Sequence, residues 1–118
     1  MLDGEGVDAA AISVTFLSGP QMRGLNRRTM GRDRATDVIA FPLEHVGQTA
    51  GDVYVCPSVA RRSARQAGIE DREELMRVVV HGVLHVLGHD HPDGRGRTGS
   101  RMWRLQERYV RELKAAGR

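Results

Sequence analysis

Four of the chain's five histidines lie within eleven residues, in the segment HGVLHVLGHDH that runs from His81 to His91. His81 and His85 are four residues apart, so on a helix they share one face and can bind the same metal ion. Gly88 allows the chain to leave the helix and reverse, so that His91 can return as a third ligand. Three histidines with an open fourth position are typical of a catalytic zinc site rather than a structural one.

The spacing H-x3-H-x2-G-x2-H is that of the metzincin zinc proteases, but Gly82 stands where such a protease has its catalytic glutamate. A glycine inside a helix costs about 1 kcal/mol relative to alanine, so Gly82 predicts a close approach by a neighbouring element or by the substrate. Asp90 is a candidate to orient a histidine ring or to act on water at the metal, and turn chemistry is its alternative role. We expect His89 to lie in an exposed loop, and the single cysteine, Cys56, to pack in the core rather than bind metal.

The helix that carries the histidines is predicted to run from Asp71 to Leu87, with Gly88 as its terminator. Asp71 and Glu74 have the spacing of a capping box, with Asp71 as the N-cap. Valines and leucines between Val78 and Leu87 make this helix apolar nearly all round, which predicts that it is buried.

The rest of the chain predicts strands that alternate with helices around one core. The stretch AISVTFL is a strand, PQMRGLNRRTM is a helix closed by Gly31, and DVIAFPLEHV is a second strand that Pro42 places at a sheet edge or a strand end. HVGQTAG is expected to be a loop and GDVYVC a third strand, followed by a helix from Pro57 to Ala67 and a last helix from about Ser100 to Ala115. These elements indicate an α/β or α+β fold: one domain over residues 1–118 with a flexible first ten residues, a small mixed sheet, about four helices, and the zinc site at the end of a buried central helix.

Size, charge and cysteine content narrow the class of protein. The chain has 118 residues and a formal charge of +3, which permits an anionic partner without requiring one. Among such partners its arginines suit nucleic acid better than an acidic protein. One cysteine excludes an internal disulfide and agrees with a reducing compartment. There is no apolar run of the roughly 20 residues that a membrane span needs, and the acidic start is unlike a secretory signal, so we expect a cytoplasmic protein.

Arginines recur at helical spacing in the last helix and could line a path for RNA phosphates. They are Arg101, Arg104, Arg108 and Arg111, preceded by Arg95 and Arg97 in a loop. The alternative is a solvated face on which Glu107 pairs with Arg111 and Glu112 with Arg108. Trp103 is more typical of core or rim packing than of base stacking.

Three segments resemble the YbeY family, the bacterial endoribonucleases of ribosomal RNA maturation. HGVLHVLGHDH is similar to the family's HGxLHLxGYDH, LNRRTMGRDRATDVIAFP resembles LNxxYRxxDxxTDVLSFP, and GDVYVC resembles GDIxIS. The resemblance covers roughly Ile12 to Leu113. It implies a cytoplasmic, zinc-dependent endoribonuclease of single-stranded RNA, which matures the 3′ end of 16S rRNA and takes part in ribosome quality control, with small-subunit proteins as further partners.

The resemblance also implies one zinc ion per chain on His81, His85 and His91, acting as a Lewis acid on a phosphoryl oxygen. Gly82 would then leave room for the RNA backbone. The family has an arginine that is thought to bind phosphate, and the corresponding position of this chain is Met30. Arg28 and Arg32 are therefore the candidates to replace that arginine.

Two further departures from the family are Ala40 in place of a serine, and the lack of the strand and helix that usually precede AISVTFL. The second departure implies either a core thinner than the family norm or a start codon chosen too late. Two other functions stay open: a zinc-containing ribosome assembly factor without catalysis, and a small zinc peptidase, which the glycine at position 82 opposes.

Overall fold

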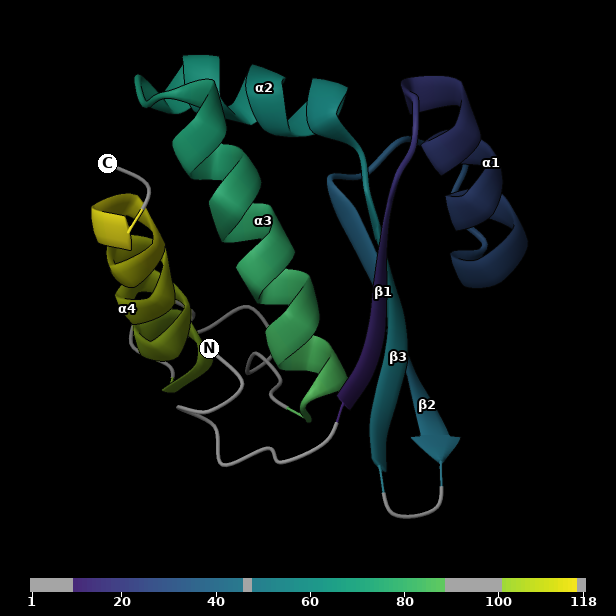
Figure 1. Ribbon diagram of the computed structural model, residues 1–118. Helices are drawn as coiled ribbons and strands as arrows, with labels where there is room; N and C mark the ends of the chain where they lie inside the picture. Colours follow the sequence, from purple (N-terminus) through teal and green to yellow (C-terminus); the bar gives the residue numbers. More distant parts are fainter. Residues whose placement is uncertain (1–9, 46–47, 89–100, 117–118) are drawn as a thin grey trace.

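The computed structural model describes residues 10–45, 48–88 and 101–116, which form a mixed sheet with helices on both of its faces (Figure 1). The elements follow in the order β1 (Ala10–Phe16), α1 (Gly19–Met30), β2 (Val38–His45), β3 (Gln48–Val55), α2 (Pro57–Ala67), α3 (Asp71–Val86) and α4 (Arg101–Ala116). The strand order is β1-β3-β2, with β1 parallel to β3 and β2 antiparallel to it. The predicted mixed sheet with about four helices is therefore confirmed within the described residues.

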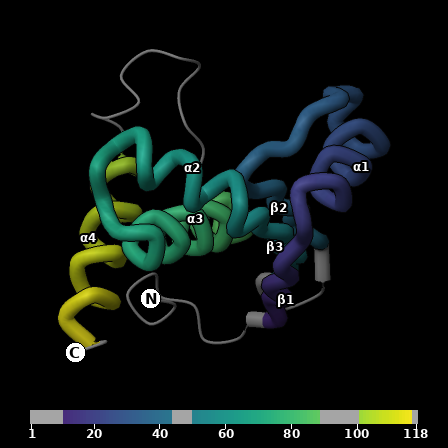
Figure 2. Tube along the Cα trace, turned by 90° about the horizontal axis from the view of Figure 1, so that it is seen from above, coloured from purple at the N-terminus to yellow at the C-terminus, as the bar shows by residue number. Residues whose placement is uncertain are grey.

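Helix α3 lies between the sheet and α4, whereas α1 lies on the opposite side of the sheet (Figures 1 and 2). On the α3 side, Val53 and Val55 of β3 pack against Val78 and Val86. On the α1 side, Met22 packs with Ile39 of β2. Because side chains alternate along a strand, those of β2 and β3 are divided between two apolar layers, one on each face of the sheet.

The outer face of α3 is covered by α4. Val80 and Leu84 of α3 pack with Met102, Tyr109 and Val110 of α4, and all five side chains are buried. Because α3 is enclosed by the sheet, α2 and α4, the prediction of a buried central helix is confirmed, although the two histidines stay half-buried.

Helix α3 lies directly on β3 because a glycine occupies the contact from each side. A Cβ atom on Gly82 would lie 2.5 Å from Cγ1 of Val53, and one on Gly51 would lie 2.6 Å from Cγ1 of Val86. Both distances are shorter than real carbon contacts, so neither position accepts a side chain without movement of the backbone or of a branched valine. Gly82 therefore serves the close approach of a neighbouring element, and the interpretation that it leaves room for RNA is wrong.

Two local predictions at chain turns are corrected. The N-cap of α3 is Glu70, which makes no side-chain cap bond, and Asp71 is already helical. Glu74 does not reach back to the helix start, because its carboxylate accepts a hydrogen bond of 3.0 Å from Arg77. The capping box belongs instead to α1, where Ser18 Oγ accepts from the Gln21 amide (3.3 Å) and Gln21 Oε1 accepts from the Ser18 amide (2.9 Å).

Most of the segment HVGQTAG belongs to strands rather than to a loop, since β2 continues through His45 and β3 begins at Gln48. Gly51, predicted as the first residue of the third strand, lies inside β3, where it faces Val86. Pro42 lies on β2, which is an edge strand as predicted, and an edge position tolerates the missing amide donor. No helix among the described residues is long and apolar enough to cross a membrane.

Strand β1 forms the other edge of the sheet and is poorly covered. Val14 and Phe16 pair with Val53 and Val55, so they point to the α3 side, yet they are 40% and 57% exposed.

Candidate functional site

His81 and His85 share one face of α3, as their spacing predicts. Their ring centroids are 4.7 Å apart and their planes are inclined by 72°. Two imidazoles at this separation can both direct a nitrogen to one ion, at the distance of about 2.0–2.1 Å that zinc requires. The donor set therefore fits a zinc ion as far as it is described.

The third predicted ligand, His91, lies outside the described residues, and so does Asp90. Within residues 10–45, 48–88 and 101–116, no three possible ligands of the histidine, cysteine, aspartate or glutamate type come together. Gly88, which follows α3, has a φ of +97°, a left-handed conformation that lets the chain turn away after the second histidine. The zinc site thus remains a prediction on two described ligands.

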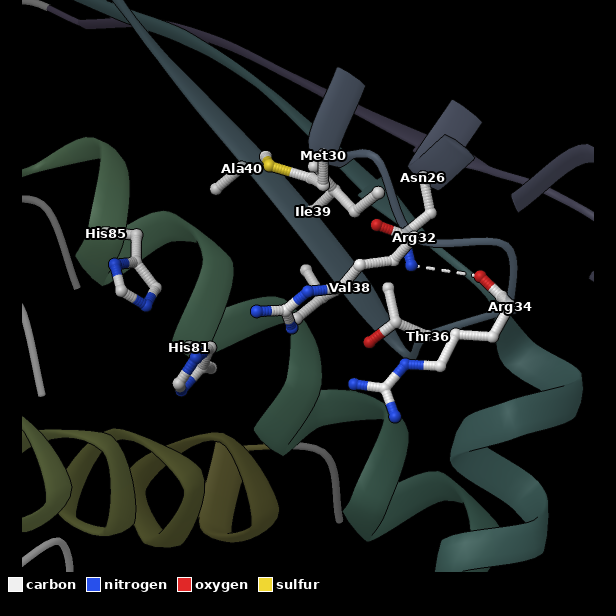
Figure 3. Close-up of a pocket in the computed structure, with 10 residues that line it drawn as sticks. All are labelled: Asn26, Met30, Arg32, Arg34, Thr36, Val38, Ile39, Ala40, His81 and His85. Carbon is white, nitrogen blue, oxygen red and sulfur yellow. Dashed lines mark hydrogen bonds between the residues drawn. The ribbon is translucent and has the colours of Figure 1, made fainter. Parts of the chain in front are cut away.

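The two histidines form one wall of a cavity of about 370 Å³ between α3, β2 and the segment that joins α1 to β2 (Figure 3). The other walls come from the end of α1, from the joining segment and from the first residues of β2. The lining residues are Asn26, Met30, Arg32, Arg34, Thr36, Val38, Ile39, Ala40, His81 and His85.

Of the two arginines proposed to replace the family arginine, the structure brings only Arg32 to the histidines. Arg32 lines the cavity and extends toward His81 in Figure 3. Arg28 points back along α1, with its guanidinium close to Gly24, and does not line the cavity.

Arg34 also lines the cavity, and the sequence reasoning missed it. The hint was present in GRDRAT, where two arginines flank an aspartate. Asp33 is turned to Arg23, which binds it through two hydrogen bonds of 2.8 and 3.0 Å, and these bonds lower the pKa of the Asp33 carboxyl. Asn26 Nδ2 donates to the carbonyl of Arg34 at 2.9 Å, so the two residues that follow Arg32 are both tied to α1.

Two departures from the family pattern fall inside this cavity. Met30, at the position of the family arginine, lines the cavity and is 49% exposed, and Ala40, at the position of the family serine, lines it as well. The cavity therefore has a thioether and a methyl group where the resemblance leads one to expect a guanidinium and a hydroxyl.

Behind His81, a chain of hydrogen bonds leads away from the cavity into α4. Nδ1 of His81 lies 2.8 Å from Oε1 of Gln106, and Nε2 of Gln106 donates to Glu107 at 3.1 Å. Glu107 also accepts two bonds from Arg77, of 2.8 and 2.9 Å, in a forked pair. Burial alone would raise the pKa of Glu107, but the bonds from Arg77 and Gln106 outweigh it and the pKa is lowered.

Arg77 is the centre of a larger cluster of charges. Besides Glu107 it donates to Glu74 (3.0 Å) and Glu73 (3.2 Å), and Glu73 also binds Lys114. The bond to Glu107 is the main cause that raises the pKa of Arg77. The cluster lies beside a second cavity, of about 410 Å³, which His81 shares with the first.

The predicted arginine stripe on α4 is exposed and stands apart from the histidine cavity. Arg101, Arg104 and Arg108 do not line it, and Arg97 lies outside the described residues. Arg108 pairs with Glu112 at 3.2 Å, as expected, but Glu107 pairs with Arg77, so the predicted Glu107–Arg111 pair is wrong.

Two further residues were candidates for the site, and only Cys56 is shown to pack in the core. Cys56 is fully buried beside Met22 and Ile39, with Sγ 3.3 Å from Ser58 Oγ, which confirms its packing role. Trp103 is half-buried and lines the second cavity.

Comparisons with known proteins match nearly the whole chain to one family. The family model described as endoribonuclease YbeY matches residues 2–114. A relative named endoribonuclease YbeY from Thermotoga maritima is 35% identical over 102 residues, which cover 86% of this chain and 67% of the relative. One of the same name from Koribacter versatilis is 41% identical over 85 residues, 72% of this chain and 55% of the relative.

A solved structure gives the same result for the fold. The solution structure of a Thermotoga maritima protein matches with a TM-score of 0.68 and 32% identity, over 96% of this chain and 74% of that chain. The chain spans about two thirds or less of the length of the curated relatives named above. With a family model that matches nearly its full length, the chain belongs to the YbeY endoribonuclease family.

Proposed function

We propose that this protein is a zinc-dependent endoribonuclease that cleaves single-stranded RNA at the cavity beside His81 and His85. The observation that carries the proposal is the convergence, in one cavity, of two histidines at metal-binding spacing with the side chains of Arg32 and Arg34. Relatives named endoribonuclease support the class of reaction.

The charges of the cavity favour a polyanion. Among its described lining residues, the permanently charged side chains are Arg32 and Arg34. A guanidinium matches the geometry of a phosphate group and binds it through two parallel hydrogen bonds. In this proposal Arg32, which extends toward His81, holds the phosphate next to the metal, and Arg34 holds a neighbouring phosphate of the same strand.

The metal would be held by His81 and His85, with His91 as the third ligand in this proposal. A bound zinc ion supplies Lewis acidity toward a phosphoryl oxygen. The protein's own residues then bind the backbone and fix its orientation, so the rate gain expected from them is one of positioning and charge stabilisation.

The biological substrate belongs to the same proposal. We infer from the family that it is ribosomal RNA, at the 3′ end of 16S rRNA, and that the protein acts in ribosome maturation and quality control with small-subunit proteins as partners. A location in the cytoplasm follows from such a substrate.

A second function has one observation in its favour. Met30 places a thioether in the cavity where the family resemblance leads one to expect arginine, which weakens phosphate binding at the site. A zinc-containing ribosome assembly factor without catalysis would tolerate this change. A zinc peptidase finds no such support, because position 82 faces Val53 of the sheet and cannot present a glutamate to the cavity.

The test is cleavage of a precursor small-subunit rRNA fragment by purified protein loaded with one zinc ion. The His85→Ala variant and a chelator-treated sample run beside it, together with a peptide substrate pool. The proposal expects RNA cleavage that both controls abolish and no peptide cleavage. RNA binding without cleavage, unaffected by His85→Ala, would support the assembly factor instead.

A further inference from the structure

Gln106 is a buried amide whose two ends have different partners. Its side chain is only 3% exposed, so both its oxygen and its nitrogen need hydrogen-bond partners inside the protein. Oε1 lies 2.8 Å from Nδ1 of His81, and Nε2 lies 3.1 Å from Oε2 of Glu107. The amide therefore connects a predicted metal ligand with a carboxylate on the next residue of α4.

The orientation of the Gln106 amide is set by its contact with Glu107. Arg77 can only donate, and it donates two bonds to Glu107, which keeps that carboxylate an acceptor. An acceptor requires the amide nitrogen of Gln106 to face it, because an amide oxygen there would place two acceptors in contact. Oε1 of Gln106 must then face His81, and an oxygen without a hydrogen can only accept a bond from Nδ1–H.

A neutral imidazole has one N–H and one nitrogen with a lone pair, and a metal binds the latter. If Nδ1 of His81 carries the hydrogen, Nε2 carries the lone pair. When the ring nitrogen that does not bind the metal donates a hydrogen bond to the protein, that bond fixes the ring and strengthens metal binding. Its loss typically weakens metal affinity about 10- to 100-fold.

We propose that Gln106 is a positioning residue, oriented by Glu107 and Arg77, which holds His81 in its Nδ1–H tautomer with Nε2 as the metal-binding nitrogen. This inference rests on the zinc site of the proposed function, but not on RNA cleavage. It assigns to the α3–α4 contact a purpose beyond packing: α4 presents the amide that fixes the first histidine of the motif.

The tautomer can be measured in the metal-free protein. Long-range ¹H–¹⁵N NMR spectra, recorded at pH 8, distinguish the protonated from the unprotonated ring nitrogen of a neutral imidazole. We expect His81 of the unaltered protein to carry its hydrogen on Nδ1. In Gln106→Met, an unbranched replacement of similar length without an acceptor, the Nε2–H form should appear.

Zinc affinity, measured by competition with a chromophoric chelator, is the second readout. Gln106→Met should weaken zinc binding about 10- to 100-fold. Glu107→Gln changes no atom that contacts His81, but it removes the carboxylate that orients the amide of Gln106. The amide can then turn, so both tautomers of His81 should be populated. This measurement does not depend on whether Gln106→Met folds well.

An Nε2–H tautomer in the unaltered protein, or zinc affinity unchanged in both Gln106→Met and Glu107→Gln, would overturn the proposal, as would failure of the protein to bind zinc. Both readouts are made without RNA. A protein that passes them but cleaves no RNA would therefore count against the proposed nuclease function and leave the role of Gln106 standing.

Discussion

Gly82 of α3 and Val53 of β3 are in contact so close that a Cβ atom on the glycine would lie 2.5 Å from the valine Cγ1. Gly82 lies between the two histidine positions of the motif, and the contact therefore sets the height of both above the sheet. A glycine that looks like a missing catalytic residue in a protease motif is here a packing residue between the two histidines predicted to bind metal.

Gly82→Ala should destabilise the fold in spite of the better helix propensity of alanine. Overpacking a core contact costs about 1–3 kcal/mol, and the alanine regains only about 1 kcal/mol in helix propensity, so we expect a net loss of about 1 kcal/mol in the free energy of unfolding. Urea denaturation measures it.

The matched control is Gly24→Ala in α1, where the added Cβ would meet only the mobile end of Arg28, at 3.1 Å. That variant should be neutral or more stable. Equal stabilisation by the two substitutions would show that α3 does not need glycine at the sheet.

Arg32→Ala should lower kcat/KM for RNA, because Arg32 reaches the cavity and Arg28 does not. Loss of one hydrogen-bonded charge contact costs roughly 1.5–3 kcal/mol, or about 10- to 100-fold in rate. Arg28→Ala removes the same charge four residues earlier and should cleave nearly as fast as the unaltered protein. Equal losses in both variants would point to general electrostatic attraction rather than to a phosphate contact in the cavity.

Met30→Arg should raise the cleavage rate, since it places a guanidinium in the cavity at the position of the family arginine. We expect a gain of about tenfold, equivalent to one phosphate contact of roughly 1.4 kcal/mol. Thr29→Arg adds the same charge on the exposed side of α1, where Thr29 binds the Leu25 carbonyl and does not line the cavity. A rate that rises equally in both variants, or in neither, would mean that position 30 has no special access to the substrate.

The pair of Arg77 with Glu107 predicts a loss of stability in acid. The folded-state pKa of Glu107 is lowered from its usual 4.5, so its contribution is complete above that pH and declines as the pH falls through the lower folded value. Denaturation at pH 6 and pH 3.5 should therefore show a smaller loss of stability for Glu107→Gln than for the unaltered protein. Glu112→Gln removes a carboxylate from an exposed pair and should leave the loss unchanged; an identical loss in all three proteins would contradict the role of the Arg77 pair.

The histidine face and the order of elements could be predicted from the sequence because each depends on local periodicity. His81 and His85 share a face at a spacing of four, and glycines at the ends of helices mark where they stop. The α3 cap was misplaced because Asp71 and Glu74 have the spacing of a capping box, yet Glu74 is bound by Arg77 one turn later.

Three relationships that the sequence did not predict join distant segments. The close contact of Gly51 with Val86 has no signal in the sequence, and neither has Gln106 as a partner of His81, 25 residues away. Arg34 was overlooked for the same reason, since only the folding of the α1–β2 segment over α3 brings it to the cavity. Contacts of this kind are set by packing between elements, on which local patterns carry no information.

The most direct test of the account is a titration of metal-free protein with zinc, in which cleavage of the single-stranded rRNA fragment is followed against equivalents of zinc added. We predict that the rate rises linearly and saturates at one equivalent, and that His85→Ala stays inactive throughout. Cleavage by the metal-free protein at the same rate as by the zinc-loaded protein would contradict the account.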